Sequence, residues 1–197
     1  MRAPGLEPAR GRLLVATPLL REPTFARTVV VLLEHDPDEG SFGVVLNRPL
    51  DVDGADVLPD VAPLLTPPDT LFQGGPVSPT TAVALGLLTP AATNTAPATA
   101  DESGWAPVTG PLVTVDLDHD ADALAGALRA LRVFVGYAGW AAGQLDGEIE
   151  EGAWFVVDGL PLDPFGADPG RLWSAVLRRQ GWPLAAVAVA PIDPGLN

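Results

Sequence analysis

The chain has 197 residues and a hydrophobic content of 47%, which suits one domain of ordinary size with a substantial core. The chain has 11 arginines, no lysine and 25 acidic residues, which gives a formal net charge of −14. This charge disfavours direct binding to DNA, to an acidic partner or to a membrane surface. Cysteine is absent and histidine occurs twice, which excludes disulfides, thiolate nucleophiles and Cys-based zinc sites, so we expect no metal and no cofactor.

Nothing at the N-terminus resembles an export signal. Residues 1–11 are predicted to form a flexible leader, and 12–197 a single domain without internal repeats. The apolar stretch 13–20 is too short for an export signal and is interrupted by proline. No run approaches the ~20 apolar residues that span a bilayer. We therefore expect a cytoplasmic protein with no membrane segment.

Four strands are predicted in the first half of the chain. Continuous β-branched and aliphatic runs at 28–34 and 43–47 are typical of strands buried on both faces. The stretch HDPDEGS between them contains Pro37 and Gly40, so the two strands are expected to form a hairpin. Two further strands are predicted at 70–73 and 80–88.

The second half alternates strands and helices. Residues 89–104 are rich in Ala, Thr, Pro and Asn and are predicted to form a surface loop. Strands are expected at 111–117, 133–136 and 153–157. One helix is predicted over 118–132, with Asp118 or Asp120 as its N-cap. A second helix is predicted over 168–181, where Asp168 and Pro169 mark the start and Gly181 the end. Its inward face consists of Leu172, Trp173, Val176 and Leu177.

These elements predict the fold class α/β (α+β), as a single compact domain. Several buried strands with helices between them indicate a mixed β-sheet covered by helices on both faces in three layers, with antiparallel pairing from the hairpin. The strand–helix–strand segment 111–136 is predicted to be a parallel crossover unit.

The stretch GYAGWAAGQLDGEIEEGAW starts at Gly136 and places further glycines at 139, 143 and 147. We predict a short helix over 138–146, with Gly139 and Gly143 on one face, where another backbone approaches closely. Trp140 and Gln144 would share a neighbouring face that continues to Glu148. The alternative to a binding role is tight packing, with Tyr137 and Trp140 as core aromatics. The spacing matches no nucleotide-binding glycine motif.

The hairpin also predicts a candidate anion site. If Glu34 lies opposite Phe42, the register places Arg27 and Thr28 beside Arg48 and Asn47. The adjacent sequence QGGPV contributes Gln73 and offers backbone N–H groups at Gly74 and Gly75, which suit an anion. The alternative is that each arginine pairs with a structural carboxylate.

Other candidate side chains have simpler structural explanations. His35, between Glu34 and Asp36, suits a general base or metal ligand, but a histidine at a hairpin turn is usually exposed. The acidic cluster at 116–122 around His119 is explained by a strand end followed by a helix cap. Glu148, Glu150 and Glu151 suggest acid/base chemistry, although no partner nucleophile is identifiable.

Three separated motifs resemble the YqgE/AlgH family of bacterial proteins. They are GRLLVATPLLREPTFARTVVVLLEHDPDEGSFGVVLNRP (11–49), FQGGPV (72–77) and GYAGWAAGQLDGEIEEGAWFVV (136–157), and the similarity continues to the ending PIDPGLN. The family often has a Leu-His pair where this chain has Leu85 and Gly86. The resemblance implies a compact mixed α/β fold and a cytosolic bacterial location.

The resemblance implies no settled activity, although one branch of the family is named for regulation of alginate synthesis. Two classes of function therefore stay open. The first is a non-enzymatic binding or regulatory protein that acts on a protein partner or a small anionic ligand, through a groove between the LNRP, GGPV and GYAGW motifs. The second is a hydrolase or transferase that uses Glu34, His35 or Glu148 with arginine stabilisation. We expect Arg48, Gly75 and Trp140 to converge in space.

Overall fold

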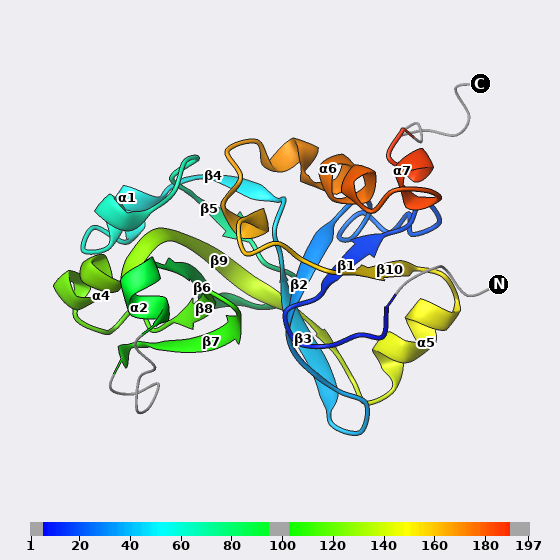
Figure 1. Cartoon of the computed structure of the whole chain (residues 1–197), viewed down its shortest axis with the longest axis horizontal. Coiled ribbons are helices and arrows are strands. Elements are labelled where there is room, and N and C mark those ends of the chain that lie inside the picture. The colour runs from blue at the N-terminus through cyan, green and yellow to red at the C-terminus, as the bar shows by residue number, and fades with distance from the viewer. Residues whose placement is uncertain (1–5, 95–102, 190–197) are drawn as a thin grey trace.

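The computed structural model describes residues 6–94 and 103–189, and its strands form one mixed sheet (Figure 1). Eight strands follow the order β10-β1-β2-β3-β9-β6-β8-β7, and β4 and β5 join them through the pairing of β5 with β9. The strands are β1 (Leu13–Ala16), β2 (Val29–Asp36), β3 (Gly40–Val45), β4 (Pro49–Asp53), β5 (Thr70–Gln73), β6 (Val77–Leu88), β7 (Trp105–Thr109), β8 (Leu112–Val115), β9 (Leu128–Trp140) and β10 (Trp154–Val157).

Short helices connect and cover the strands. They are α1 (Gly54–Val57), α2 (Pro90–Thr93), α4 (Ala121–Ala127), α5 (Gln144–Glu150), α6 (Leu172–Arg179) and α7 (Leu184–Val187), with 3-10 turns η1 (Ala62–Leu64), η2 (Asp163–Phe165) and η3 (Pro169–Arg171). Within the described residues, none of these helices has the length and apolar character needed to cross a membrane.

The fold is a single α+β domain with a mixed sheet, as predicted. Strands β2 and β3 form the expected hairpin, with Glu34 opposite Phe42 and a register shift between Leu32 and Glu34. β8 and β9 both run antiparallel to β6, so they are parallel to each other, as the crossover prediction requires. However, β6 lies between them in the sheet.

Helices cover both faces of the sheet because alternate strand residues join different cores. In β1, Leu13 and Val15 belong to one hydrophobic cluster, whereas Leu14 and Ala16 belong to another. Helix α6 contributes Trp173, Val176 and Leu177 to the first cluster, and α5 contributes Leu145 and Ile149 to the second.

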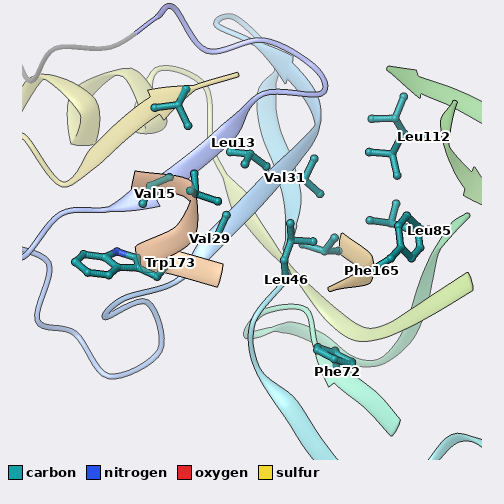
Figure 2. Close-up of a cluster of buried hydrophobic side chains, with 14 of the residues drawn as sticks. Leu13, Val15, Val29, Val31, Leu46, Phe72, Leu85, Leu112, Phe165 and Trp173 are labelled. Atoms are coloured by element: carbon teal, nitrogen blue, oxygen red, sulfur yellow. The ribbon is translucent and has the colours of Figure 1, made fainter. Parts of the chain in front are cut away.

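The first cluster also joins the two halves of the sheet. Leu13, Val31 and Leu46 come from the β1–β2–β3 half, and Leu85 and Leu112 come from β6 and β8 on the other half (Figure 2). These side chains are at most 2% exposed. Burial of this apolar surface at about 25 cal/mol per Å² is the main stabilising contribution to such a core.

Two helix predictions were partly or wholly wrong. The predicted helix 118–132 begins as expected, with the Asp120 carboxylate accepting from Ala123 N at 2.8 Å, but it ends at Ala127. Residues 128–132 instead belong to β9, where Ala130 lies opposite Leu87 and Arg132 opposite Leu85. Pairing with β6 overrides the local helical pattern, since helix propensity is a weak prior against tertiary contacts.

The predicted helix over 138–146 was wrong for the same reason. Residues 137–140 continue β9, and Trp140 pairs with Ser41 of β3. The helix in this region is α5, which starts only at Gln144, after Gly143 adopts φ +69°. Gly139 and Gly143 therefore do not share a helix face.

The other predicted elements are present with small changes of boundary. Helix 168–181 consists of η3 followed by α6, and Leu172 is only partly buried beside the three inward residues. In the predicted loop 89–104, residues 90–93 form α2, while 95–102 lie outside the described residues. Of the predicted leader, residues 1–5 also lie outside them, and Leu6 N donates to Val156 O of β10 at 3.0 Å.

Three glycines allow β5 and β9 to approach closely where the QGGPV sequence meets GYAGW. A Cβ on Gly74 would lie 2.2 Å from the Gly136 carbonyl oxygen, and one on Gly75 would lie 2.2 Å from the Tyr137 carbonyl carbon. Gly136 itself has φ +70°, which strongly favours glycine. These glycines are required by the backbone geometry.

Arg132 is a buried cation that ties two loops to β9. Its side chain donates to the carbonyl oxygens of Pro164, Gly166, Thr66 and Pro67 at 2.8–3.1 Å and lies over the Phe72 ring, 4.3 Å from its centroid. Burial lowers the pKa of Arg132 to about 10, so it stays charged at neutral pH. The residue is 2% exposed.

We predict that Gly74→Ala destabilises the protein by about 3 kcal/mol, because the added methyl group meets rigid backbone atoms of β9. The matched control is Gly126→Ala in α4, where a Cβ has no neighbour within 4 Å; its effect should stay within about 1 kcal/mol and favour stability. Urea unfolding followed by circular dichroism measures both. Equal midpoints for the two variants would contradict the close-packing argument.

We also predict that Arg132→Met lowers the free energy of unfolding by more than about 3 kcal/mol, since four carbonyl acceptors lose their charged donor. Arg129→Met on the same strand is the control, because Arg129 is exposed. Its effect should stay within about 0.5 kcal/mol. A similarly small effect at Arg132 in urea unfolding would show that the two loops are held by other contacts.

Candidate functional site

A groove of about 780 Å³ lies at the end of the β2–β3 hairpin, where β3 pairs with the last residues of β9. We call it the hairpin groove. Its lining comes from hairpin residues 34–36 and 39–42, from Val77, from β9 residues 137, 139 and 140, and from Arg10. The groove therefore joins two of the three sequence motifs, and Val77 brings in the end of the third.

Three strands contribute neighbouring positions to the groove. Glu34 lies opposite Phe42, and Phe42 lies opposite Gly139, so the three residues form a row across β2, β3 and β9. The Phe42 ring meets Tyr137 edge to face, with centroids 5.9 Å apart and planes at 73°. Both rings are half-buried and Gly139 is exposed, so apolar surface and strand backbone are both accessible.

The charged side chains that line the groove are mostly acidic. The carboxylates of Glu34, Asp36 and Glu39 line it, all three residues are exposed, and Arg10 is the cation among the lining residues. Asp36 also organises the turn, because its Oδ1 accepts from Asp38 N at 2.8 Å and from Glu39 N at 3.1 Å. Three carboxylates and one guanidinium therefore line the groove.

A histidine and a serine pair inside the groove. His35 and Ser41 are cross-strand neighbours in the hairpin, and His35 Nδ1 lies 2.8 Å from Ser41 Oγ. A hydroxyl hydrogen-bonded to an imidazole has the contact that an activated nucleophile needs. The same bond also closes a hairpin end, so it has a structural explanation as well.

Trp140, Gln144 and Glu148 come together as predicted, although not along one helix. Glu148 Oε2 accepts from Trp140 Nε1 at 2.9 Å and from Trp154 Nε1 at 2.8 Å, while Oε1 accepts from Gln144 Nε2 at 3.0 Å. Both carboxylate oxygens thus hold neighbouring side chains. Glu148 fixes the Trp140 indole at one wall of the groove.

The four hairpin residues of the predicted anion site are neighbours, as the register indicated. Asn47 Nδ2 donates to Arg27 O at 2.9 Å and its Oδ1 accepts from Val29 N at 3.0 Å, while Thr28 Oγ1 donates to Phe25 O at 2.8 Å. Thr28 and Asn47 are buried. The polar side-chain groups of these two residues bind backbone atoms.

The two arginines of that site also contact the scaffold. The Arg48 guanidinium donates to Ala26 O, and burial lowers the pKa of Arg48 from its usual value. The Arg27 guanidinium lies over the Trp173 ring, 4.5 Å from its centroid. Arg48 thus contacts a backbone carbonyl, and Arg27 contacts an aromatic ring.

The QGGPV segment contacts both of the other motifs. Gln73 N donates to Arg48 O at 2.8 Å, and Gly75 packs against the Tyr137 backbone, three residues before Trp140 on β9. Trp140 pairs with Ser41 at the start of β3, whereas Arg48 lies beyond its other end, so Arg48, Gly75 and Trp140 are not brought to one site. Gly74 N donates to Val135 O at 2.8 Å, so this N–H group is used within the sheet. Gln73 is exposed beside it.

The remaining acidic clusters match their structural explanations. Asp116 Oδ1 accepts from Asp118 N at 3.0 Å and Asp120 caps α4, as expected for a strand end followed by a helix start. In residues 6–94 and 103–189, no group of three or more His, Asp or Glu side chains is arranged to hold a metal ion.

Sequence reasoning missed most of the groove lining. It considered Glu34, His35, Tyr137 and Trp140, but not Ser41, Phe42, Glu39 or Arg10. The hairpin register contained part of the signal, because it placed Ser41 opposite His35. The rest depends on the pairing of β3 with β9, two segments almost a hundred residues apart, for which the sequence has no local pattern.

The chain is similar to known bacterial proteins along nearly its whole length. A model of the family described as AlgH-like matches residues 13–185. A UPF0301 protein of Streptomyces coelicolor is 51% identical over 188 residues, which cover 95% of this chain and 94% of that protein. A crystal structure from Corynebacterium diphtheriae superposes with a TM-score of 0.84 at 34% identity, covering 95% of each chain. The solution structure of the AlgH protein from Pseudomonas aeruginosa gives a TM-score of 0.66 at 27% identity, covering 97% and 98%.

One departure from the family motif can now be located. At Gly86, where the family often has histidine, an added Cβ would lie 2.6 Å from Val115 Cγ2 and 2.8 Å from Leu128 Cδ2. In this chain the position is filled by core side chains and lies outside the lining of the hairpin groove. With three motifs, a matching family model and half-identical relatives along nearly its whole length, the chain belongs to the AlgH-like family of bacterial proteins.

Proposed function

We propose that this chain is a non-enzymatic binding protein of the bacterial cytoplasm, which recognises a partner through the hairpin groove. The main observation behind the proposal is the aromatic pair Phe42 and Tyr137. Both rings are half-buried and lie beside carboxylates in a groove of about 780 Å³. Exposed aromatic surface next to polar groups is typical of recognition sites.

The charge distribution supports action through a protein partner. With a net charge of −14 and three carboxylates along the groove, contact with nucleic-acid phosphates is electrostatically unfavourable. A regulatory role, as the name of one family branch suggests, would therefore be exerted on another protein. The small anionic ligand considered from the sequence remains a less favoured occupant, since Arg27 and Arg48 contact Trp173 and Ala26.

A second candidate function has one observation in its favour. The hydrogen bond between His35 and Ser41 places a base beside a hydroxyl group within the same groove. This arrangement suits acyl transfer, with Ser41 as nucleophile and His35 as general base. Glu148 is a poor candidate for this chemistry, because its carboxylate accepts from two indoles and an amide.

We expect immobilised wild-type protein to retain a partner from a lysate of its own bacterium. Tyr137→Ala should retain roughly tenfold less of that partner, since truncating a central interface aromatic costs more than about 1.4 kcal/mol of binding free energy. Trp182→Ala is the matched control, because Trp182 is 85% exposed and lies outside the groove. Quantitative mass spectrometry of the retained proteins measures the effect. Retention that depends on Trp182 and is indifferent to Tyr137 would place the binding site elsewhere.

We expect purified wild-type protein and Ser41→Ala to show the same background with chromogenic ester substrates, because the binding proposal gives Ser41 no chemical role. Absorbance of the released phenolate at neutral pH is the measurement. His35→Ala serves as a second variant, since it removes the base and keeps the hydroxyl. Turnover that disappears in both variants would establish the second candidate in place of the first.

A further inference from the structure

Gly139 is a glycine that the fold itself does not require. A Cβ on Gly139 would meet Tyr137 Cε2 at 3.4 Å and Val77 Cγ2 at 3.7 Å, which are ordinary van der Waals distances. Its φ lies outside the left-handed region, in contrast to that of Gly136. Glycine inside a strand lowers stability, so a glycine without a packing or conformational reason needs another explanation.

The position of Gly139 supplies that explanation. It lies in β9 opposite Phe42, in the same row as Glu34, and it is exposed where it lines the hairpin groove. Any other residue would raise a side chain between Tyr137 and Val77. The missing side chain leaves the β9 backbone open to close approach by another molecule, which is a recognised use of strand glycine.

The chemistry around this opening favours a cation. Glu34 and Glu39 are exposed carboxylates on the hairpin, and the half-buried Phe42 and Tyr137 rings line the groove beside them. Aromatic faces and carboxylates both attract guanidinium and ammonium groups. Arg10 reduces the local negative charge without reversing it, and the −14 charge of the whole chain steers cations toward the surface.

We propose that the occupant of the hairpin groove is an extended, cationic segment of a protein partner. Its main chain crosses the open backbone at Gly139, and an arginine or lysine side chain lies against the Phe42–Tyr137 pair within reach of Glu34. The inference rests on the proposed function, which requires only that the groove binds a partner. Charge complementarity selects this occupant, because an acidic segment would face three carboxylates.

The test uses two short fluorescent peptides, one with arginine alternating with serine and one with glutamate in place of arginine. Fluorescence anisotropy at physiological salt should show binding of the arginine peptide only. Gly139→Leu places a side chain in the groove and should weaken that binding roughly tenfold or more. Gly147→Leu in α5 is the matched control with unchanged affinity, because a Cβ there also has no clash.

A second pair of variants separates groove recognition from general charge attraction. Glu34→Gln with Glu39→Gln changes the net charge from −14 to −12, as does Glu150→Gln with Glu151→Gln at exposed glutamates outside the groove lining. The first pair should weaken binding roughly tenfold and the second less than about twofold. Equal weakening by the two pairs would overturn the inference.

Failure of the inference differs from failure of the proposed function. If lysate capture depends on Tyr137 but the glutamate peptide binds as well as the arginine peptide, or neither binds, the groove has another occupant. If capture is independent of Tyr137, the proposed function itself is wrong. Circular dichroism confirms folding of each variant, and Gly139→Ala, whose methyl group makes only ordinary contacts, replaces Gly139→Leu should that variant unfold.

Discussion

The close approach of the Gly74–Gly75 backbone to β9 is the constraint on which the rest of the structure depends. Gly74 N donates to Val135 O of β9, and Gly74 O accepts from Val45 N of β3, so one residue joins three strands. A side chain at either glycine would overlap β9 backbone atoms. Because β3 is held beside β5 in this way, its other end reaches Gly139 and Trp140, and the hairpin groove forms there.

The sequence predicted the elements whose signals are local. The hairpin, its register at Glu34 and Phe42, the cap at Asp120 and the inward face of α6 all follow from short-range patterns. The missed boundaries share one cause. Residues 128–132 contain only Leu, Arg and Ala, which favour a helix, and Gly139 in the stretch 137–140 is unfavourable in a strand. These residues join β9 because β3 and β6 pair with them. Such pairing leaves no periodic trace in the strand itself.

The predicted site residues separate into two sets once their hydrogen bonds are known. Thr28, Asn47 and Arg48 satisfy backbone groups of the segment before β2, and the Glu148 carboxylate satisfies two indole N–H groups. Buried polar groups without partners are costly, so these side chains are explained by folding alone. Residue type could not separate them from Glu34 and Tyr137, since the distinction lies in what each side chain contacts.

Glycine shows most clearly how scaffold and recognition differ in this protein. Three glycines are needed because two backbones approach closely or because φ is positive, and this requirement of the fold explains them fully. They are Gly74, Gly75 and Gly136. Gly139 stands on the same strand with ordinary space around it, at a cost of about 1 kcal/mol relative to alanine. Pairing of β9 with β3 at residues 138–140 and with β6 between Leu128 and Tyr137 offsets that loss. Under the proposed function, the stability that the first three glycines provide allows the fourth position to stay open for a partner.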